Sequence, residues 1–382
     1  MMPDMKIVVA PDKFKGCLTA AQVADAMAAG IRDALPNTMI DSCPIADGGE
    51  GFVDTLVRAT AGRFITRKVT GPLPDMKVDA IFGILGDGKT AVIEMAAAAG
   101  LALLKPGERN PFATTTFGVG ELIRAAIENG CRKILLGIGG SATVDGGIGC
   151  AQATGHTIVL QDGEPVSPTE PLTGRDLERI VMVKQHRGEV TDGVEIIVAC
   201  DVTNPLYGPT GAAAVFGPQK GATPDQVASL DAWLHGLATR TGKETEANTP
   251  GAGAAGGLGF GLMAFFSAKL VSGIELVLDA TKLRDRLQGA DLCLTAEGRL
   301  DGQSVDGKAT AGVANLCRQL GVPCVAIAGS VGEGASNMYG QGLTAYFSIC
   351  DHPMTLEQAI ADAPRLIQHT AMNVVRLSGL RG

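Results

Sequence analysis

Acidic side chains recur directly after the short apolar runs that the sequence predicts to be β-strands. Asp47 follows one such run, Asp201 follows another, and Glu297 and Asp301 follow a third. Carboxylate oxygens suit Mg²⁺, which binds one or two of them together with substrate phosphates. A single Asp after a strand is often only a turn former or a helix cap. Several such positions interleaved with glycines favour a site for an anionic, phosphorylated ligand and a divalent metal.

A glycine-rich loop at residues 139–147 reads GGSATVDGG. Glycines let backbone N–H groups approach an anion closely, and nearby hydroxyls can add donors. A tight turn between a strand and a helix would need neither the two hydroxyls nor the four glycines. We therefore predict that this loop contacts a phosphate or a nucleotide. The residues assigned to the contact are Gly139, Gly140, Ser141, Thr143 and Gly146.

Lys220 lies in a second candidate loop, FGPQKG, at residues 216–221. Its ammonium group could meet a phosphate as a point charge. A solvated lysine in the turn before a helix at Pro224 is an equally good interpretation. We keep Lys220 as a candidate nucleotide contact with both interpretations open.

Two segments match well-known nucleotide motifs but lack the required surroundings. Residues 83–90, GILGDGKT, match a P-loop, yet the flanks are short and β-like and meet at Asp-Gly, which favours a hairpin. Residues 251–256, GAGAAG, match a dinucleotide fingerprint, but no strand precedes them. We expect the second segment to be a closely packed loop that leads into a helix at residues 258–270, with a backbone-lined anion site still possible there.

Apolar runs alternate with helical patterns along most of the chain, which is typical of a parallel α/β sheet. The first unit has a strand at residues 6–10 and a helix that opens with a capping box of Thr19 and Gln22. Residues 63–95 instead favour antiparallel strands. We predict two α/β domains. Residues 1–70 and 286–382 would form a doubly wound domain of the Rossmann or flavodoxin type, and residues 71–285 an inserted α/β domain.

Composition excludes several classes of protein. The 382 residues carry a net charge of −8 without a basic block and include only 15 aromatic residues (11 Phe, three Tyr, one Trp), so a nucleic-acid partner is not expected. Nine scattered cysteines indicate reduced thiols in a cytoplasmic protein. The sequence shows neither a signal peptide nor an apolar span long enough for a membrane helix, so we do not expect a membrane location. The oligomeric state stays undetermined.

The ordered set of segments resembles the bacterial glycerate kinase family, of the type that yields 2-phosphoglycerate. The segments that carry the resemblance are IVVAPDKFKG, PIADGGEG, AVIEMAAAAGL, RNPFATTTFGVGELI, GIGGSATVDGG, ACDVTNPLYGPTGAAAVFGPQKGAT, PGAGAAGGLGFGL and LTAEGRLDGQS. The family pattern has Asn where this chain has Val144, and Gly where it has Ala296.

The resemblance implies ATP-dependent phosphorylation of D-glycerate with Mg²⁺, on two α/β domains with the active site in the cleft between them. Phosphoryl transfer needs positioning, charge neutralisation and a group that orients the attacking hydroxyl. We assign Asp201 as the base, Lys15 to the transferring phosphate and Arg299 to the glycerate carboxylate. Asp47 and Asp301 are assigned to Mg²⁺ or substrate hydroxyls, and Glu297 is a further metal candidate.

Two other classes stay open at the level of the sequence. An NAD-dependent oxidoreductase of a small 2-hydroxy acid would use residues 251–256. A non-catalytic protein that binds a small acid would need no ATP. The many carboxylates after strands make that second alternative the less favoured one.

Overall fold

The computed structural model describes residues 5–46, 49, 51–184, 191–305 and 309–378. Asp47, an assigned site residue, lies outside these described residues. The chain divides into two compact units. Unit 1 comprises residues 1–47 and 274–382, and unit 2 comprises residues 48–273. No helix among the described residues is long and apolar enough to cross a bilayer.

Unit 1 is built on a five-stranded sheet in which all neighbouring strands are parallel. Its strands are β1 (Lys6–Val9), β2 (Met39–Ser42), β11 (Leu292–Leu300), β12 (Cys324–Val331) and β13 (Ala345–Ser348). Their spatial order is β13-β12-β11-β1-β2. Counted along the chain within this unit, that is the order 2-1-3-4-5 of flavodoxin-like sheets. The order reverses between β1 and β11.

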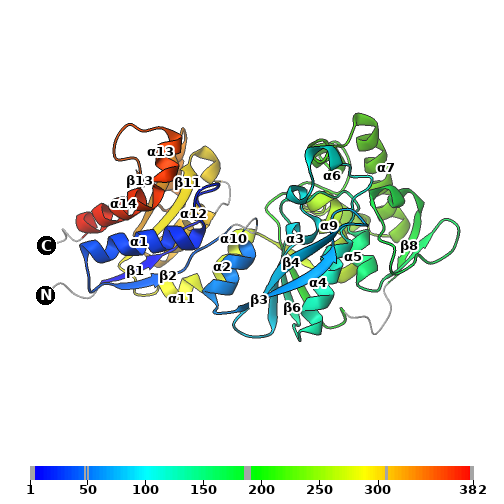
Figure 1. Cartoon of the computed structure of the whole chain (residues 1–382), viewed down its shortest axis with the longest axis horizontal. Coiled ribbons are helices and arrows are strands. Elements are labelled where there is room, and N and C mark those ends of the chain that lie inside the picture. Colours follow the sequence, from blue (N-terminus) through cyan, green and yellow to red (C-terminus); the bar gives the residue numbers. More distant parts are fainter. Residues whose placement is uncertain (1–4, 47–48, 50, 185–190, 306–308, 379–382) are drawn as a thin grey trace. The chain divides into compact units, whose positions relative to one another are not determined.

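The helices α1 (Ala20–Ala34) and α14 (Ala363–Ser378) lie side by side in unit 1 (Figure 1). Gly30 of α1 permits the contact, because a Cβ atom there would lie 2.1 Å from the carbonyl oxygen of Gln368. The Thr19 hydroxyl accepts from the N–H of Gln22 and the Gln22 side chain accepts from Thr19, which confirms the predicted capping box. The remaining helices of this part of the chain are α10 (Gly273–Ala280), α11 (Leu283–Leu287), α12 (Ala309–Leu320) and α13 (Leu356–Ala361).

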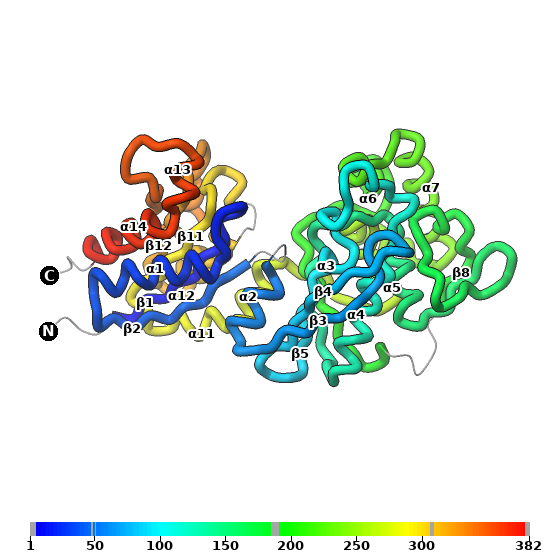
Figure 2. Tube along the Cα trace, viewed as in Figure 1, coloured from blue at the N-terminus to red at the C-terminus, as the bar shows by residue number. Residues whose placement is uncertain are grey.

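Unit 2 is built on a six-stranded mixed sheet with the order β10-β9-β6-β5-β4-β3. Its strands are β3 (Arg63–Thr70), β4 (Lys77–Ile84), β5 (Thr90–Glu94), β6 (Lys133–Gly137), β9 (Glu195–Ala199) and β10 (Lys269–Val271). The four from β10 to β5 are parallel, whereas β3, β4 and β5 form antiparallel pairs. Figure 2 shows the long β3–β4 pair.

The other elements of unit 2 surround this sheet. A separate antiparallel pair consists of β7 (Thr157–Leu160) and β8 (Ile180–Lys184). The helices are α2 (Phe52–Ala59), α3 (Ala96–Ala99), α4 (Phe117–Glu128), α5 (Ile148–Ala153), α6 (Ala212–Phe216), α7 (Pro224–Thr241), α8 (Glu244–Ala247) and α9 (Ala254–Phe266). The apolar core includes Ile93, Leu136, Val198 and Phe260, all fully buried.

The α/β class and the parallel sheets are as predicted. The P-loop match is a hairpin, as expected, because β4 and β5 pair antiparallel around Asp87-Gly88. The unit boundaries differ from the predicted domain boundaries. The segment that includes α2 and β3 belongs to unit 2, since β3 pairs along its whole length with β4. Residues 274–285 belong to unit 1 instead of the inserted domain.

Candidate functional site

In unit 1 the reversal of strand order places two chain segments at the carboxyl ends of β1 and β11. Ligands of such sheets bind outside the carboxyl ends of the strands at this switch point. The N–H of Asp12, after β1, donates to the carbonyl oxygen of Ala296 in β11 (2.8 Å). Lys15 lies exposed in the following turn, and its backbone nitrogen is 3.4 Å from the position of a Cβ on Gly298. The Lys15 turn therefore lies close to β11 at Gly298.

An ion pair at the end of β11 joins two of the assigned substrate residues. The Nε atom of Arg299 lies 2.8 Å from Oδ2 of Asp301, and the two side chains are 70% and 18% exposed. The other oxygen of Asp301 accepts from the N–H of Gln303 (2.9 Å). Asp301 thus fixes the guanidinium group at its Nε side, while most of the Arg299 side chain faces solvent.

Glu297 occupies a different environment from Asp301. Its side chain is buried within β11, and its Oε2 atom accepts from the hydroxyl of Ser304 (3.1 Å). Lys15, Glu297, Arg299 and Asp301 therefore belong to one edge of the unit 1 sheet. The Glu297 carboxylate is buried and already accepts a hydrogen bond from the protein.

In unit 2 the carboxyl ends of the four parallel strands lie level with one another. Glu94 is in register with Gly137, Gly137 with Ala199, and Ala199 with Val271. The loops that follow begin at the same edge of the sheet. These loops contain Gly139 and Gly140 after β6, Asp201 after β9, and Ser272 after β10.

Asp201 follows β9, as the sequence predicted, and its side chain is exposed. Its Oδ1 atom accepts from the N–H of Gly273 (2.8 Å) and from the hydroxyl of Ser272 (3.3 Å). These contacts come from the loop after the neighbouring strand β10. They fix the direction of the Asp201 carboxylate without removing it from solvent.

The glycine-rich loop is exposed only at its start. Gly139 and Gly140 are exposed, and Gly140 has φ +74°, a conformation that favours glycine. Ser141 and Thr143 are buried, 8% and 0% exposed. An anion from solvent would therefore meet the backbone of Gly139 and Gly140. The two hydroxyls face the interior of unit 2.

Lys220 is the residue that fastens this loop. Its Nζ atom donates to the hydroxyl of Ser141 and to the carbonyl oxygen of Thr143, both at 2.7 Å. The side chain is 2% exposed, so the interpretation as a solvated turn lysine is wrong. Burial lowers the pKa of Lys220 to about 7, and the charge of Asp145 opposes that shift.

Asp145 holds the end of this loop in position, although no motif in the sequence points to it. Its buried carboxylate accepts from the N–H and the hydroxyl of Thr116 (2.7 and 2.8 Å) and from the N–H of Gly147 (3.1 Å). Burial raises the pKa of Asp145 above its usual value, and these hydrogen bonds offset only part of that rise. Asp145 thereby ties the end of the loop to the start of α4. Its place between Val144 and two glycines was the only signal in the sequence.

The GAGAAG segment packs against the same loop. No strand precedes it, and the backbone of Ala255, Gly256 and Gly257 is left-handed, so it is not a dinucleotide fingerprint. Gly256 has φ +68°, and a Cβ there would lie 1.8 Å from the carbonyl oxygen of Thr143. The expectation of close glycine packing is confirmed, and the NAD interpretation is wrong for lack of a βαβ unit.

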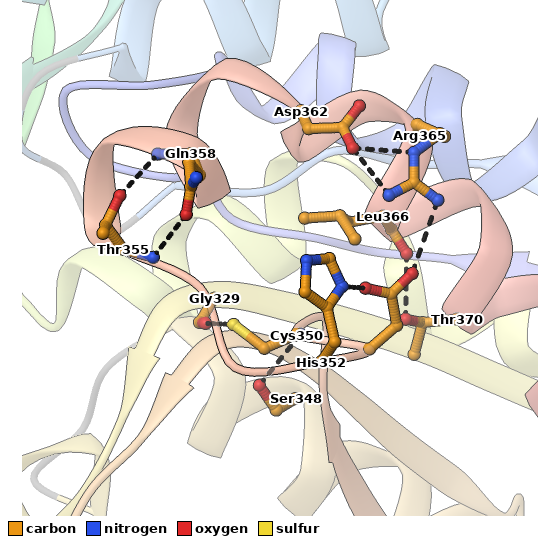
Figure 3. A network of polar contacts seen from close by, with 11 residues as sticks. Gly329, Ser348, Cys350, His352, Thr355, Gln358, Asp362, Arg365, Leu366 and Thr370 are labelled. Carbon is orange, nitrogen blue, oxygen red and sulfur yellow. Dashed lines mark hydrogen bonds and ion pairs between the residues drawn. The ribbon is translucent and has the colours of Figure 1, made fainter.

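Two further groups at strand ends were also missed. Glu94 accepts from the N–H of Val53 in α2 (2.9 Å), a contact between residues 41 apart in sequence. After β13, Asp351 accepts from His352 (2.6 Å) and pairs with Arg365 (3.4 Å), as Figure 3 shows around the labelled His352 and Arg365. The hydrogen bond from His352, with support from Arg365, lowers the pKa of Asp351. The Glu94 contact depends on a residue far along the chain, whereas Asp351 is held by its neighbour His352 and by Arg365.

The whole chain matches one family of enzymes. The model of the glycerate kinase family covers residues 7–379. The chain belongs to the glycerate kinase family. It is 45% identical over 377 residues to a glycerate kinase of Halalkalibacterium halodurans, covering 97% of this chain and 98% of the relative. It is 43% identical over 375 residues to the glycerate 2-kinase of Escherichia coli, with 97% of each chain covered.

A solved structure agrees with this membership. The putative glycerate kinase 2 of Salmonella typhimurium superimposes with a TM-score of 0.87 at 43% identity, over 98% of each chain. The protein is therefore a kinase of the glycerate kinase family, and the oxidoreductase and non-catalytic alternatives are set aside. Val144 and Ala296, the two departures noted in the sequence, are both fully buried. Neither side chain faces an exposed part of the candidate site.

Proposed function

We propose that this enzyme transfers the γ-phosphoryl group of ATP to the C2 hydroxyl of D-glycerate, forming 2-phospho-D-glycerate. The observation that carries the proposal is the Arg299–Asp301 pair at the switch point of unit 1, beside the Lys15 turn. An exposed cation held by a carboxylate suits a small acid that also carries hydroxyls. The name of the Escherichia coli relative, glycerate 2-kinase, supports the choice of the C2 hydroxyl.

The unit 1 residues receive the substrate roles. Arg299 binds the glycerate carboxylate through the guanidinium N–H groups that its Nε contact with Asp301 leaves over, and Asp301 orients the group. A planar guanidinium suits a two-pronged contact with a carboxylate. Lys15, exposed on the adjacent turn, neutralises charge on the transferring phosphoryl group.

The unit 2 residues receive the nucleotide and base roles. The exposed backbone of Gly139 and Gly140 contacts phosphate oxygens, and Lys220 keeps that backbone in place through Ser141 and Thr143. Gly146 permits the close packing of the loop, because a Cβ there would lie 2.9 Å from a methyl carbon of Leu237. Asp201 accepts the proton of the attacking hydroxyl on one carboxylate oxygen. Its other oxygen, Oδ1, accepts the hydrogen bond from the N–H of Gly273.

The carboxylates present fit a Mg²⁺ ion of the kind that accompanies ATP. Mg²⁺ is commonly held by one or two carboxylates plus substrate phosphates rather than by a cage of protein ligands. Among the described residues no three carboxylates cluster, which matches that habit. We assign Asp301 to the ion, with Glu297 in β11 as a further candidate and Asp47 assigned from the sequence. The ion would supply charge neutralisation at the phosphates.

The proposal is tested by measuring ADP release with a panel of small hydroxy acids. We expect release with D-glycerate, weaker release with acids that lack the C3 hydroxyl, and none without Mg²⁺. ADP release that is equal with and without D-glycerate would contradict the proposal. A matched control is L-glycerate, which has the same groups in the mirror arrangement.

A further inference from the structure

Three buried cysteines meet in unit 1 at a place remote from the candidate site. The trithiol cluster consists of Cys293 in β11, Cys324 in β12 and Cys317 in α12, each 0% exposed. All three Sγ atoms lie within 4.8 Å of one another. All three are free thiols. We propose that the trithiol cluster is a binding site for one trivalent thiophilic metalloid, of the class represented by arsenous acid.

The topology explains why the three sulfur atoms meet. Cys293 and Cys324 are paired residues of two adjacent parallel strands, so their side chains leave the same face of the sheet at the same level. Cys317 lies on the helix that leads into β12, and its carbonyl oxygen accepts from the N–H of Val322 in the connecting turn. The short turn returns the chain to the sheet directly beneath the last turn of α12.

The cluster is separate from the proposed catalytic edge. Cys293 and Cys324 stand at the amino ends of β11 and β12, whereas Glu297, Arg299 and Asp301 belong to the carboxyl end of β11 or follow it. The rise along a strand is about 3.3 Å per residue, so the length of β11 separates Cys293 from Arg299. A ligand bound by the cluster would therefore act through the packing of α12 on the sheet, not through contact with substrate.

The ligand set selects the class of ion. The cluster contains three sulfurs and, among the described residues, no His, Asp or Glu joins it. Soft thiolates select soft ions, and bonds of about 2.3 Å to one pyramidal centre bring three sulfurs to roughly 3.5 Å from one another. Because the sulfur atoms lie within 4.8 Å of one another, they reach that spacing by moving at most about 1.3 Å closer.

Charge decides between the soft ions. Three thiolates carry three negative charges, so a monovalent ion such as Cu(I) leaves a charge of −2 and a divalent ion such as Zn²⁺ leaves −1. A trivalent centre leaves none. Because a net charge in a buried site is costly unless it is paired, the neutral product fits this interior best.

The binding step is a condensation without electron transfer. Arsenous acid, As(OH)₃, reacts with three thiols to form As(SR)₃ and three water molecules. Three As–O and three S–H bonds break, three As–S and three O–H bonds form, and arsenic stays trivalent. The product would tie α12 covalently to two strands of the sheet.

The test is mass spectrometry of the full-length protein after incubation with arsenous acid and then with excess dithiothreitol. Dithiothreitol removes arsenic that is bound by only one or two thiols and leaves arsenic that is bound by three. Incubation is done with native protein and with protein refolded in the presence of the reagent, so that a buried site is reached. We expect a single adduct with the mass of one arsenic less three hydrogens, and a raised unfolding temperature.

The variants Cys317→Ser and Cys324→Ala should lose both the adduct and the rise in unfolding temperature. Cys131→Ser, which removes another buried thiol from unit 2, should keep both. Circular dichroism of each variant without arsenic shows whether it folds. No adduct in either incubation, or an adduct that persists in folded Cys317→Ser or Cys324→Ala, would overturn the proposal.

Discussion

The Nζ atom of Lys220 donates a hydrogen bond of 2.7 Å to the hydroxyl of Ser141, 79 residues away along the chain. Both side chains are buried, so the bond joins the loop before α7 to the glycine-rich loop inside unit 2. The bond thereby fixes, from the interior of unit 2, the loop whose exposed backbone is that of Gly139 and Gly140. The shape of the proposed phosphate contact depends on a lysine that solvent does not reach.

The lowered pKa of Lys220 predicts a pH-dependent stability. In the folded protein this pKa is about 7, below the value of about 10.4 for a lysine in an unfolded chain. Between those values the unfolded chain binds a proton that the folded chain lacks, so the cost of burying Lys220 falls and the free energy of unfolding rises as the pH rises. The free energy of unfolding, compared with that of Lys220→Met, should rise between about pH 7 and pH 9 by up to about 1.4 kcal/mol per pH unit.

Denaturant unfolding followed by the fluorescence of Trp233, the single tryptophan, reports on unit 2 and measures this difference. A difference between the wild type and Lys220→Met that is independent of pH would mean that Lys220 is charged in the folded protein. Lys243→Met, which removes a partly exposed lysine from the same unit, provides the control.

Replacing Gly256 should destabilise unit 2 through a steric clash. A Cβ at Gly256 would lie 1.8 Å from the carbonyl oxygen of Thr143, and φ is +68°. Gly88 has φ +69° but no atom within 4 Å of its Cβ position, which makes Gly88→Ala a matched control. Gly88→Ala should cost about 1–2 kcal/mol for the backbone alone, and Gly256→Ala a further 1–3 kcal/mol or so. Equal losses in Trp233-monitored unfolding would show that the Thr143 contact relaxes freely.

Changing Arg299 should weaken the binding of glycerate more than it slows turnover. A lysine keeps the charge but loses the planar two-pronged contact and the Nε bond to Asp301. We expect Arg299→Lys to raise KM for D-glycerate about tenfold or more, as the loss of a charge-assisted hydrogen bond implies. KM for ATP should change little. An unchanged KM for D-glycerate would remove Arg299 from the carboxylate contact.

Replacing Asp201 should slow turnover strongly with little loss of stability. In Asp201→Asn the side-chain oxygen still accepts from the N–H of Gly273, so the loop keeps its hydrogen bond. Loss of the base should lower kcat by between about a hundredfold and ten-thousandfold. Binding of D-glycerate, measured by calorimetry, should persist. A kcat near that of the wild type would exclude Asp201 as the base.

Local patterns were enough for much of the fold. The Asp-Gly pair between two short β-like runs predicted the hairpin of β4 and β5, and Thr19 with Gln22 predicted the start of α1. The C-terminal helical segment is divided into α13 and α14, because Pro364 has no N–H for the i→i−4 bond and α13 ends before it. The predicted helix at 258–270 ends earlier, at Phe266, and its last two residues belong to β10, because a strand of three residues has no distinct period in the sequence.

Contacts between distant residues could not be predicted. Whether Lys220 is solvated or buried depends on Ser141 and Thr143, and no pattern near Lys220 records those partners. The role of Asp145 depends on Thr116, 29 residues earlier in the chain, and no pattern near Asp145 indicates that partner. The exposed candidates Lys15, Asp201 and Arg299 were found because strand ends are visible in the sequence, and their chemical roles stay predictions.

The position of the transferred phosphoryl group tests the central claim most directly. The enzyme is incubated with ATP, Mg²⁺ and D-glycerate, and the product is passed to enolase, which dehydrates 2-phosphoglycerate but not 3-phosphoglycerate. We predict that phosphoenolpyruvate forms without added phosphoglycerate mutase, in step with ADP release. ADP release with phosphoenolpyruvate only after the mutase is added would show transfer to the C3 hydroxyl and would contradict the proposed reaction.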